Sequence, residues 1–152
     1  MTLHTAIVKI EEKKISSEEA KNFILSKKNG AESTFVGRVR NENSGKKVTA
    51  VTYDVHDQAV IKSFQSICND AKNKFDKNAS IFLEHAKGYV LVGEISILIA
   101  VGSEHRDEAF KICRYILEET KHKSPIWKKE HYTEGNEEWL PGHSLRPKEE
   151  IK

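Results

Sequence analysis

One stretch of alternating apolar residues restricts the fold more than any other part of the chain. Residues 94–101 follow the period of two that is typical of a β-strand. The alternating residues are Ile95, Ile97, Ile99 and Val101. Leu98 and Ala100 make the other face partly apolar, so we expect this strand near the centre of a sheet. Ser103 follows it and is expected to cap a helix.

The helix after this strand has a predicted end. Its buried stripe is expected to consist of Ala109, Phe110, Cys113, Ile116 and Leu117. Pro125 cannot continue a helix, and it pushes Ser124 toward an extended conformation. Lys121 therefore falls on the last helical turn, and Lys128 begins the next element.

The rest of the chain alternates strands with helices. Strands are expected over residues 5–10, 33–40, 48–55 and 80–86, and in a hairpin of 126–132 and 137–140, with 89–92 as a short strand or a loop. Ser16 and Glu19 form a capping box for a short helix that Gly30 would end. Asp57 would cap a long helix with an apolar stripe over 60–75. Because hairpins imply antiparallel pairing, the predicted class is α+β, with a mixed, mostly antiparallel sheet and three helices.

Composition indicates one soluble, globular, cytoplasmic domain. The 152 residues fit a single domain over 1–152, in which 141–152 form a polar tail. The 25 basic and 23 acidic residues give a net charge of only +2, which does not indicate nucleic-acid binding. The apolar run at 95–101 is too short to span a membrane, and no signal peptide is visible. Cys68 and Cys113 fall at apolar helical positions and are expected to be buried thiols.

Three positive clusters lie at the ends of predicted elements. They are Arg38 with Arg40, His105 with Arg106, and Lys121 with Lys128 and Lys129. Each has a plain explanation: a polar strand face, a surface turn with acidic neighbours, and a solvated charge run. Three such clusters at loop edges favour a shared anion pocket more strongly than any one of them does alone. Arg38 and Arg40 are expected on one face of their strand, because side chains two apart share a face.

Other chemistries lack their motifs. The seven histidines and two cysteines show neither His-x-x-x-His nor Cys-x-x-Cys spacing, so no zinc site is expected. The glycine-rich phosphate loops and the Gly-x-Ser-x-Gly elbow are absent from the sequence. We therefore expect no metal and no cofactor.

Three blocks carry a family resemblance. Residues 35–41, 102–110 and 121–130 resemble, in order and spacing, the large, catalytic subunit of molybdopterin synthase, over roughly 31–140. The resemblance implies an α/β hammerhead fold and a homodimer within a heterotetramer. The partner would be a small ubiquitin-like sulfur-carrier subunit that ends in a Gly-Gly thiocarboxylate. Its sulfur would pass to cyclic pyranopterin monophosphate to give molybdopterin, with no nucleic acid and no membrane involved.

The resemblance also implies roles for individual residues. Lys121 and Lys128 would be catalytic, and the substrate-binding set would be Arg38, Val39, Arg40, His105, Arg106, Lys121, Lys128, Lys129 and Glu130. Arg40 and Arg106 would hold the phosphate, since a guanidinium matches its oxygens. Lys121, crowded by other cations, would have a lowered pKa that suits proton transfer. Residues 55–58 and the tail after Pro141 depart from the family pattern.

Two alternatives remain at this point. A binding module could use the same basic pocket for a phosphorylated ligand or RNA without catalysis. The modest charge and 8% aromatic content weaken the RNA version. A lysine-based Schiff-base enzyme is the second alternative.

Overall fold

The structure is a computed structural model, and it describes residues 2–133 and 137–139. The described elements are β1 (Leu3–Lys9), α1 (Ser17–Ile24), β2 (Ala31–Arg38), β3 (Glu42–Asn43), β4 (Lys46–Val55), α2 (Asp57–Lys74), β5 (Ser80–Leu91), β6 (Ile95–Ser103), α3 (Arg106–Lys123), β7 (Ile126–Tyr132) and β8 (Glu137–Trp139). The predicted turn at 134–136, Leu140 and the polar tail lie outside the described residues. None of the described helices is long and apolar enough to cross a membrane.

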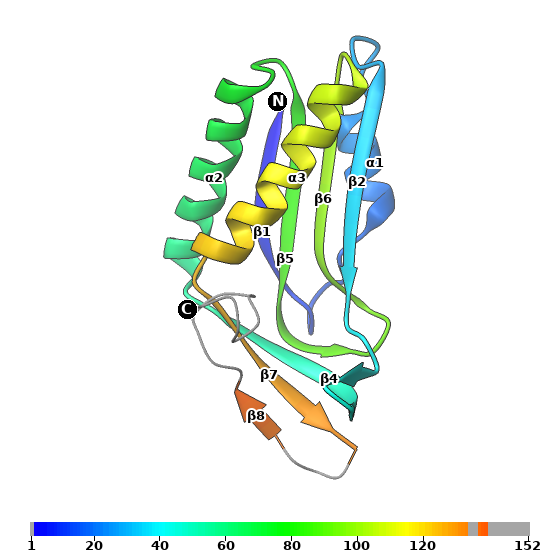
Figure 1. Ribbon diagram of the computed structural model, residues 1–152, viewed down its shortest axis with the longest axis vertical. Helices are drawn as coiled ribbons and strands as arrows, with labels where there is room; N and C mark the ends of the chain where they lie inside the picture. The colour runs from blue at the N-terminus through cyan, green and yellow to red at the C-terminus, as the bar shows by residue number, and fades with distance from the viewer. Residues whose placement is uncertain (1, 134–136, 140–152) are drawn as a thin grey trace.

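The sheet follows the order β2-β6-β5-β4-β7-β8, with β1 paired to β5 and β3 paired to β4 (Figure 1). Only the β1–β5 pairing is parallel among the described strand pairs. β6 lies between β2 and β5, which confirms the central position predicted from its two apolar faces. The predicted α+β class with a mostly antiparallel sheet is also confirmed.

β5 joins two parts of this sheet. Its first half pairs with β1 and β6, and residues 88–91 pair with β4. Gly88 has φ +110, a left-handed conformation that glycine adopts more readily than other residues. Figure 1 shows β5 turning near its lower end, where β4 and β7 cross below the main strands. Residues 89–91, predicted as a strand or a loop, therefore continue β5 into a lower sheet of β4, β7 and β8.

Helices cover both faces of the main sheet. In Figure 1, α2 and α3 lie in front of the strands and α1 lies behind them. The stripe of α2 is buried as predicted, and it consists of Val60, Phe64, Ile67, Cys68 and Ala71. Both cysteines are free and buried, as expected, and burial raises the pKa of Cys68 to about 12. The two thiols are therefore part of the core.

Two of the predicted helix caps are wrong. The Asp57 prediction fails because His56 is the N-cap of α2, and its Nδ1 accepts a hydrogen bond from the Ala59 amide at 3.3 Å. Ser103 does not cap α3, because its backbone still pairs with Ala31 in the β2–β6 ladder. Ladder pairing thus carries β6 past the predicted strand end, and the Ser103 hydroxyl donates instead to Asp76 Oδ2 at 2.5 Å.

The other departures concern α1 and the stripe of α3. Ser16 caps α1 as predicted, since its Oγ accepts from the Glu19 amide at 3.1 Å. The helix ends at Ile24, well before Gly30, whose missing side chain instead allows a close approach to the Glu104 carbonyl. Phe110 is 63% exposed, so its predicted place in the buried stripe of α3 is wrong. The buried residues of that helix are Ala109, Ile112, Cys113, Ile116 and Thr120.

Candidate anion-binding site at the end of α3

The turn from α3 into β7 is fixed by two fully buried residues. Ser124 donates its amide to the Thr120 carbonyl at 3.2 Å, and its hydroxyl lies 2.9 Å from the Ser63 hydroxyl. Ile126 is also fully buried, and its amide donates to the Ser124 carbonyl at 2.9 Å. Pro125 ends the helix as predicted, and these neighbours hold the end in place. Packing therefore sets the relative position of the lysines before and after the turn.

The three residues that follow Trp127 lie on alternating faces of β7. Side chains alternate across a strand, so Lys128 and Glu130 share one side and Lys129 lies on the other. Lys128 and Glu130 line a small cavity of about 60 Å³ together with Arg38, Val39 and Arg40 from the end of β2 and the residues after it. Residues about 90 positions apart in the sequence thus meet over the β4–β7 part of the lower sheet. Lys129, predicted to extend the binding edge, is not among the residues of this cavity.

Lys128 is the most perturbed cation of this site. Burial lowers the pKa of its ammonium, and the charges of Lys121 and Arg40 lower it further. The carboxylate of Glu130 acts in the opposite direction. Lys121 and Arg40 are therefore each close enough to Lys128 for their charges to act on its ammonium. Sequence reasoning had not predicted this shift at Lys128.

Glu130 is a held, buried carboxylate. It is 5% exposed, and the Asn43 side-chain amide donates to both of its oxygens, at 2.9 and 3.0 Å. The Tyr132 hydroxyl donates to Oε1 at 2.9 Å. With its oxygens engaged, Glu130 supplies a fixed negative charge beside Lys128. Its predicted contact with substrate stays a prediction.

A buried histidine lies beneath the cations. His85 is fully buried, and its Nδ1 lies 2.8 Å from the Ala86 carbonyl oxygen. Burial, together with the charge of Lys128, lowers the pKa of His85 to about 4, so the ring is neutral at pH 7. Its edge meets the ring of Tyr53, with centroids 4.9 Å apart, and Tyr53 also lines the cavity. Sequence reasoning missed both site residues, because each lay within an ordinary strand pattern.

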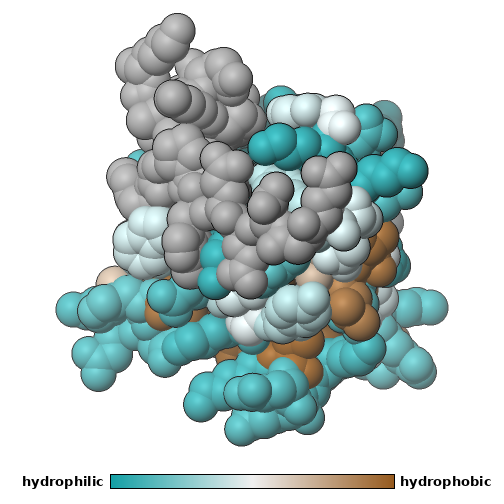
Figure 2. All heavy atoms as spheres, turned by 90° about the horizontal axis from the view of Figure 1, so that it is seen from below, coloured by the Kyte–Doolittle hydropathy of each residue, from teal (hydrophilic) through white to brown (hydrophobic). Residues whose placement is uncertain are grey.

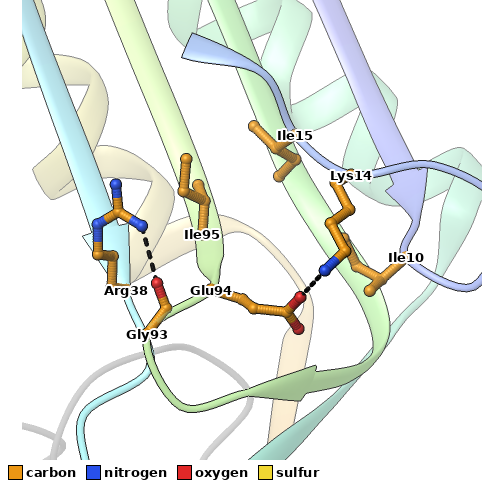
Figure 3. Close-up of a pocket in the computed structure, with 7 residues that line it drawn as sticks. All are labelled: Ile10, Lys14, Ile15, Arg38, Gly93, Glu94 and Ile95. Atoms are coloured by element: carbon orange, nitrogen blue, oxygen red, sulfur yellow. Dashed lines mark hydrogen bonds and ion pairs between the residues drawn. The ribbon is translucent and has the colours of Figure 1, made fainter.

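Arg38 and Arg40 do not share a strand face. β2 ends at Arg38, so the alternation rule does not extend to Arg40. The Arg38 guanidinium donates to the Gly93 carbonyl at 2.7 Å, as Figure 3 shows. It also lines a neighbouring cavity of about 240 Å³, across which Lys14 pairs with Glu94. Arg38 thus lies between two hollows, with its guanidinium turned toward the β5–β6 turn.

His105 and Arg106 lie at the other end of α3. Both are exposed, and they line a separate surface hollow with Asp107 and Phe110. Arg106 begins the helix and Lys121 lies in its last turn, about 22 Å further along the axis at 1.5 Å per residue. One chain therefore does not bring the His-Arg pair to the lysines. A single pocket that contains all three clusters needs a second chain.

The surface around the lower sheet is mainly polar. Figure 2 views the molecule from this end, and the described surface is largely hydrophilic with smaller apolar areas. The β5–β6 turn contributes exposed apolar side chains at Leu91 and Val92. The cavity of the site therefore lies toward a largely hydrophilic end of the molecule.

Comparison with known proteins assigns the chain to a family. The model of the family described as "MoaE protein" matches residues 10–123, and the chain belongs to this family. A molybdopterin synthase catalytic subunit of Synechococcus elongatus is 41% identical over 126 residues, which cover 83% of this chain and 76% of that protein. The corresponding subunit of Pyrococcus abyssi is 38% identical, over 82% of this chain and 83% of that one.

Solved structures agree with this assignment. A molybdopterin synthase structure from Staphylococcus aureus superposes with a TM-score of 0.82 and 26% identity, covering 93% of this chain and 98% of that one. A complex of subunits 1 and 2 of the molybdopterin-converting factor from Helicobacter pylori gives 0.69 and 23%, covering 95% and 94%, and shows the shared fold. The enzyme class of the chain is that of the molybdopterin synthase catalytic subunit, in molybdenum cofactor biosynthesis.

Proposed function

We propose that this chain transfers sulfur to cyclic pyranopterin monophosphate from the C-terminal thiocarboxylate of a small carrier subunit. The observation that carries the proposal is that the partly buried Lys128 lines a cavity together with Arg40, close enough to Lys121 for the charge of Lys121 to act on it. The substrate phosphate and the thiocarboxylate are both anions, and clustered cations at a partly desolvated edge attract both. The reaction would take place in the cytoplasm, on a single domain formed by the whole chain.

The two lysines would have different tasks. The thiocarboxylate sulfur would bond to a side-chain carbon of the pterin, and the oxygen that leaves this carbon would need a proton. Lys121, on the last turn of α3, would supply that proton. Water would then hydrolyse the bond between the sulfur and the acyl carbon of the carrier, which releases the carrier as a carboxylate and leaves the sulfur on the pterin. Lys128 has a lowered pKa, so it would exchange protons more readily near neutral pH than an exposed lysine. Arg40 would hold the phosphate.

The test uses purified protein with thiocarboxylated carrier and the pterin precursor, and measures the dithiolene product. Lys121→Ala and Lys128→Ala should each lower the single-turnover rate by at least about 100-fold, the usual size of a lost acid–base group. Lys123→Ala is the matched control, because Lys123 lies in the same cationic run but pairs with Glu119 at 2.6 Å on the exposed helix face. Near-normal product formation by Lys121→Ala would remove that lysine from the mechanism.

We further propose that the site is completed across a homodimer. His105 and Arg106 would reach the lysines of the other protomer, because their own lysines lie at the far end of α3. Mixing inactive Lys121→Ala with inactive Arg106→Ala chains tests this proposal. If the site is shared, half the dimers are mixed and each contains one intact site, so about a quarter of wild-type activity returns. If each site uses one chain only, the mixture stays inactive.

A further inference from the structure

A second cluster of polar groups lies beneath α1, on the face of the main sheet opposite to α2 and α3. It consists of His4 on β1, Glu84 on β5 and Glu19 on α1. One possible ligand atom from each of these side chains lies within 4.8 Å of the others. We propose that these three residues bind a divalent transition-metal ion of the zinc class. The proposal is independent of sulfur transfer, because the cluster shares no residue with the cationic site.

The buried carboxylate of Glu84 is the feature that indicates a bound cation. Its side chain is 2% exposed, and Oε2 lies 2.8 Å from the Nε2 of His4. The other oxygen, Oε1, is buried and finds no hydrogen-bond partner among the described residues. Removing a carboxylate from water is costly unless its charge and both oxygens are compensated. One imidazole compensates Glu84 only in part, so the site retains an unused acceptor that a metal ion would engage.

His4 is held in position to act as a ligand. Its ring stacks on Phe82 with centroids 4.6 Å apart, and it meets Phe23 at 5.7 Å. β1 and β5 are neighbours in the sheet, and their register places His4 beside Phe82, two residues from Glu84. The ring orientation is therefore set by packing. An imidazole nitrogen with carboxylate oxygens is a donor set that zinc accepts, with an open position for water.

Glu19 would supply the third ligand from the solvent side. Its amide is fixed to the Ser16 hydroxyl, and its carboxylate Oε2 pairs with the Lys13 ammonium at 2.9 Å. Lys13 therefore provides positive charge at the mouth of the cluster. A metal ion would displace it, because both cations need the same carboxylate.

The geometry requires only small side-chain adjustments. Tetrahedral zinc with bonds of about 2.0–2.2 Å places its ligand atoms roughly 3.3 Å apart. The His4–Glu84 separation of 2.8 Å is slightly shorter, and the 4.8 Å limit for the cluster is longer. Glu19 is 42% exposed and lies on the first turn of a helix, so its side chain is free to rotate inward. A bound ion would tie β1, β5 and α1 together.

Titration of the chelator-treated, full-length protein with Co²⁺ and then Zn²⁺ tests the site. The visible absorption of Co²⁺ reports its ligand geometry, and metal analysis gives the stoichiometry. We expect one ion per chain in the wild type. His4→Gln and Glu84→Gln should each weaken binding by at least about tenfold, since metal affinity is sensitive even to outer-shell changes. Lys13→Met should tighten binding, because it removes the competing ammonium.

The matched control is His122→Gln, which removes an exposed histidine that faces Glu118 at 3.9 Å on α3. It should leave Co²⁺ binding unchanged. His4 is 33% exposed, so His4→Gln remains a valid test even if Glu84→Gln fails to fold. Absence of Co²⁺ and Zn²⁺ binding by the wild type would overturn the proposal. So would a folded His4→Gln that binds both ions as tightly as the wild type.

Discussion

His85 should make the stability of this protein depend on pH. The ring is fully buried, and burial together with the charge of Lys128 lowers its pKa from 6.5 to about 4. The folded chain therefore keeps His85 neutral at a pH where the unfolded chain binds a proton. Protons then favour unfolding, so this contribution to stability is fully present above pH 6.5 and is lost as the pH falls toward 4.

The size of the effect follows from the two pKa values. Each pH unit between them corresponds to about 1.4 kcal/mol. At pH 5 the free energy of unfolding should be about 2 kcal/mol lower than at pH 7 because of His85. Below pH 4 this decrease should level off near roughly 3 kcal/mol. A domain has a total stability of about 5–15 kcal/mol, so a loss of this size is readily measured.

The assay is urea unfolding followed by circular dichroism at pH 7 and pH 5, at equal protein concentration and ionic strength. The comparison protein is His85→Gln, which has a similar volume and does not titrate. Surface carboxylates titrate alike in both proteins, so the difference between the two pH-dependent losses isolates His85. We expect the wild type to lose about 2 kcal/mol more than the variant. Equal losses would refute the assignment of a neutral, buried ring.

Three further substitutions test the framework of the fold. Ile126→Ala should lower the free energy of unfolding by about 2–5 kcal/mol, and lower product formation as well, because this fully buried residue fixes the start of β7; stability and activity assays measure the two effects. Ser16→Ala should cost about 1 kcal/mol in urea unfolding through loss of the α1 cap, whereas Ser17→Ala should cost far less. Gly88→Ala should lower the melting temperature through backbone strain alone, since a Cβ there would meet nothing within 4 Å. An unchanged melting temperature would mean that the bend in β5 does not need glycine.

Local periodicity predicted the elements of this fold well but not their ends. The alternation at 94–101 located β6 and its central place in the sheet. Its end was missed because pairing with β2 extends the strand to Ser103. The position of Phe110 was also missed: hydrophobicity predicted burial, but the sheet contacts a different face of α3. Tertiary pairing decides such boundaries, and one sequence does not contain it.

The candidate site was predictable only where its residues cluster along the chain. Lys121 and Lys128 flank one proline, and the prediction of both rests on that motif. Sequence reasoning did not assign His85 to the site, because only the fold places it under Lys128. The proposed metal-binding cluster was missed for the same reason: His4 and Glu84 are 80 residues apart, and a search for local ligand spacing does not test such pairs.

The polar contacts around Lys128 offset the cost of burying its charge. A lysine desolvated beside two other cations destabilises the fold, and the charge of Glu130 offsets part of that cost. Glu130 has this effect because Asn43 and Tyr132 hold its carboxylate in place. His85 avoids adding a further positive charge by staying neutral. The β4–β7 ladder and the buried Ile126 stabilise the lower sheet and so offset the cost of clustering these cations. Mutations that weaken the ladder or the packing of Ile126 should therefore lower activity before they unfold the protein.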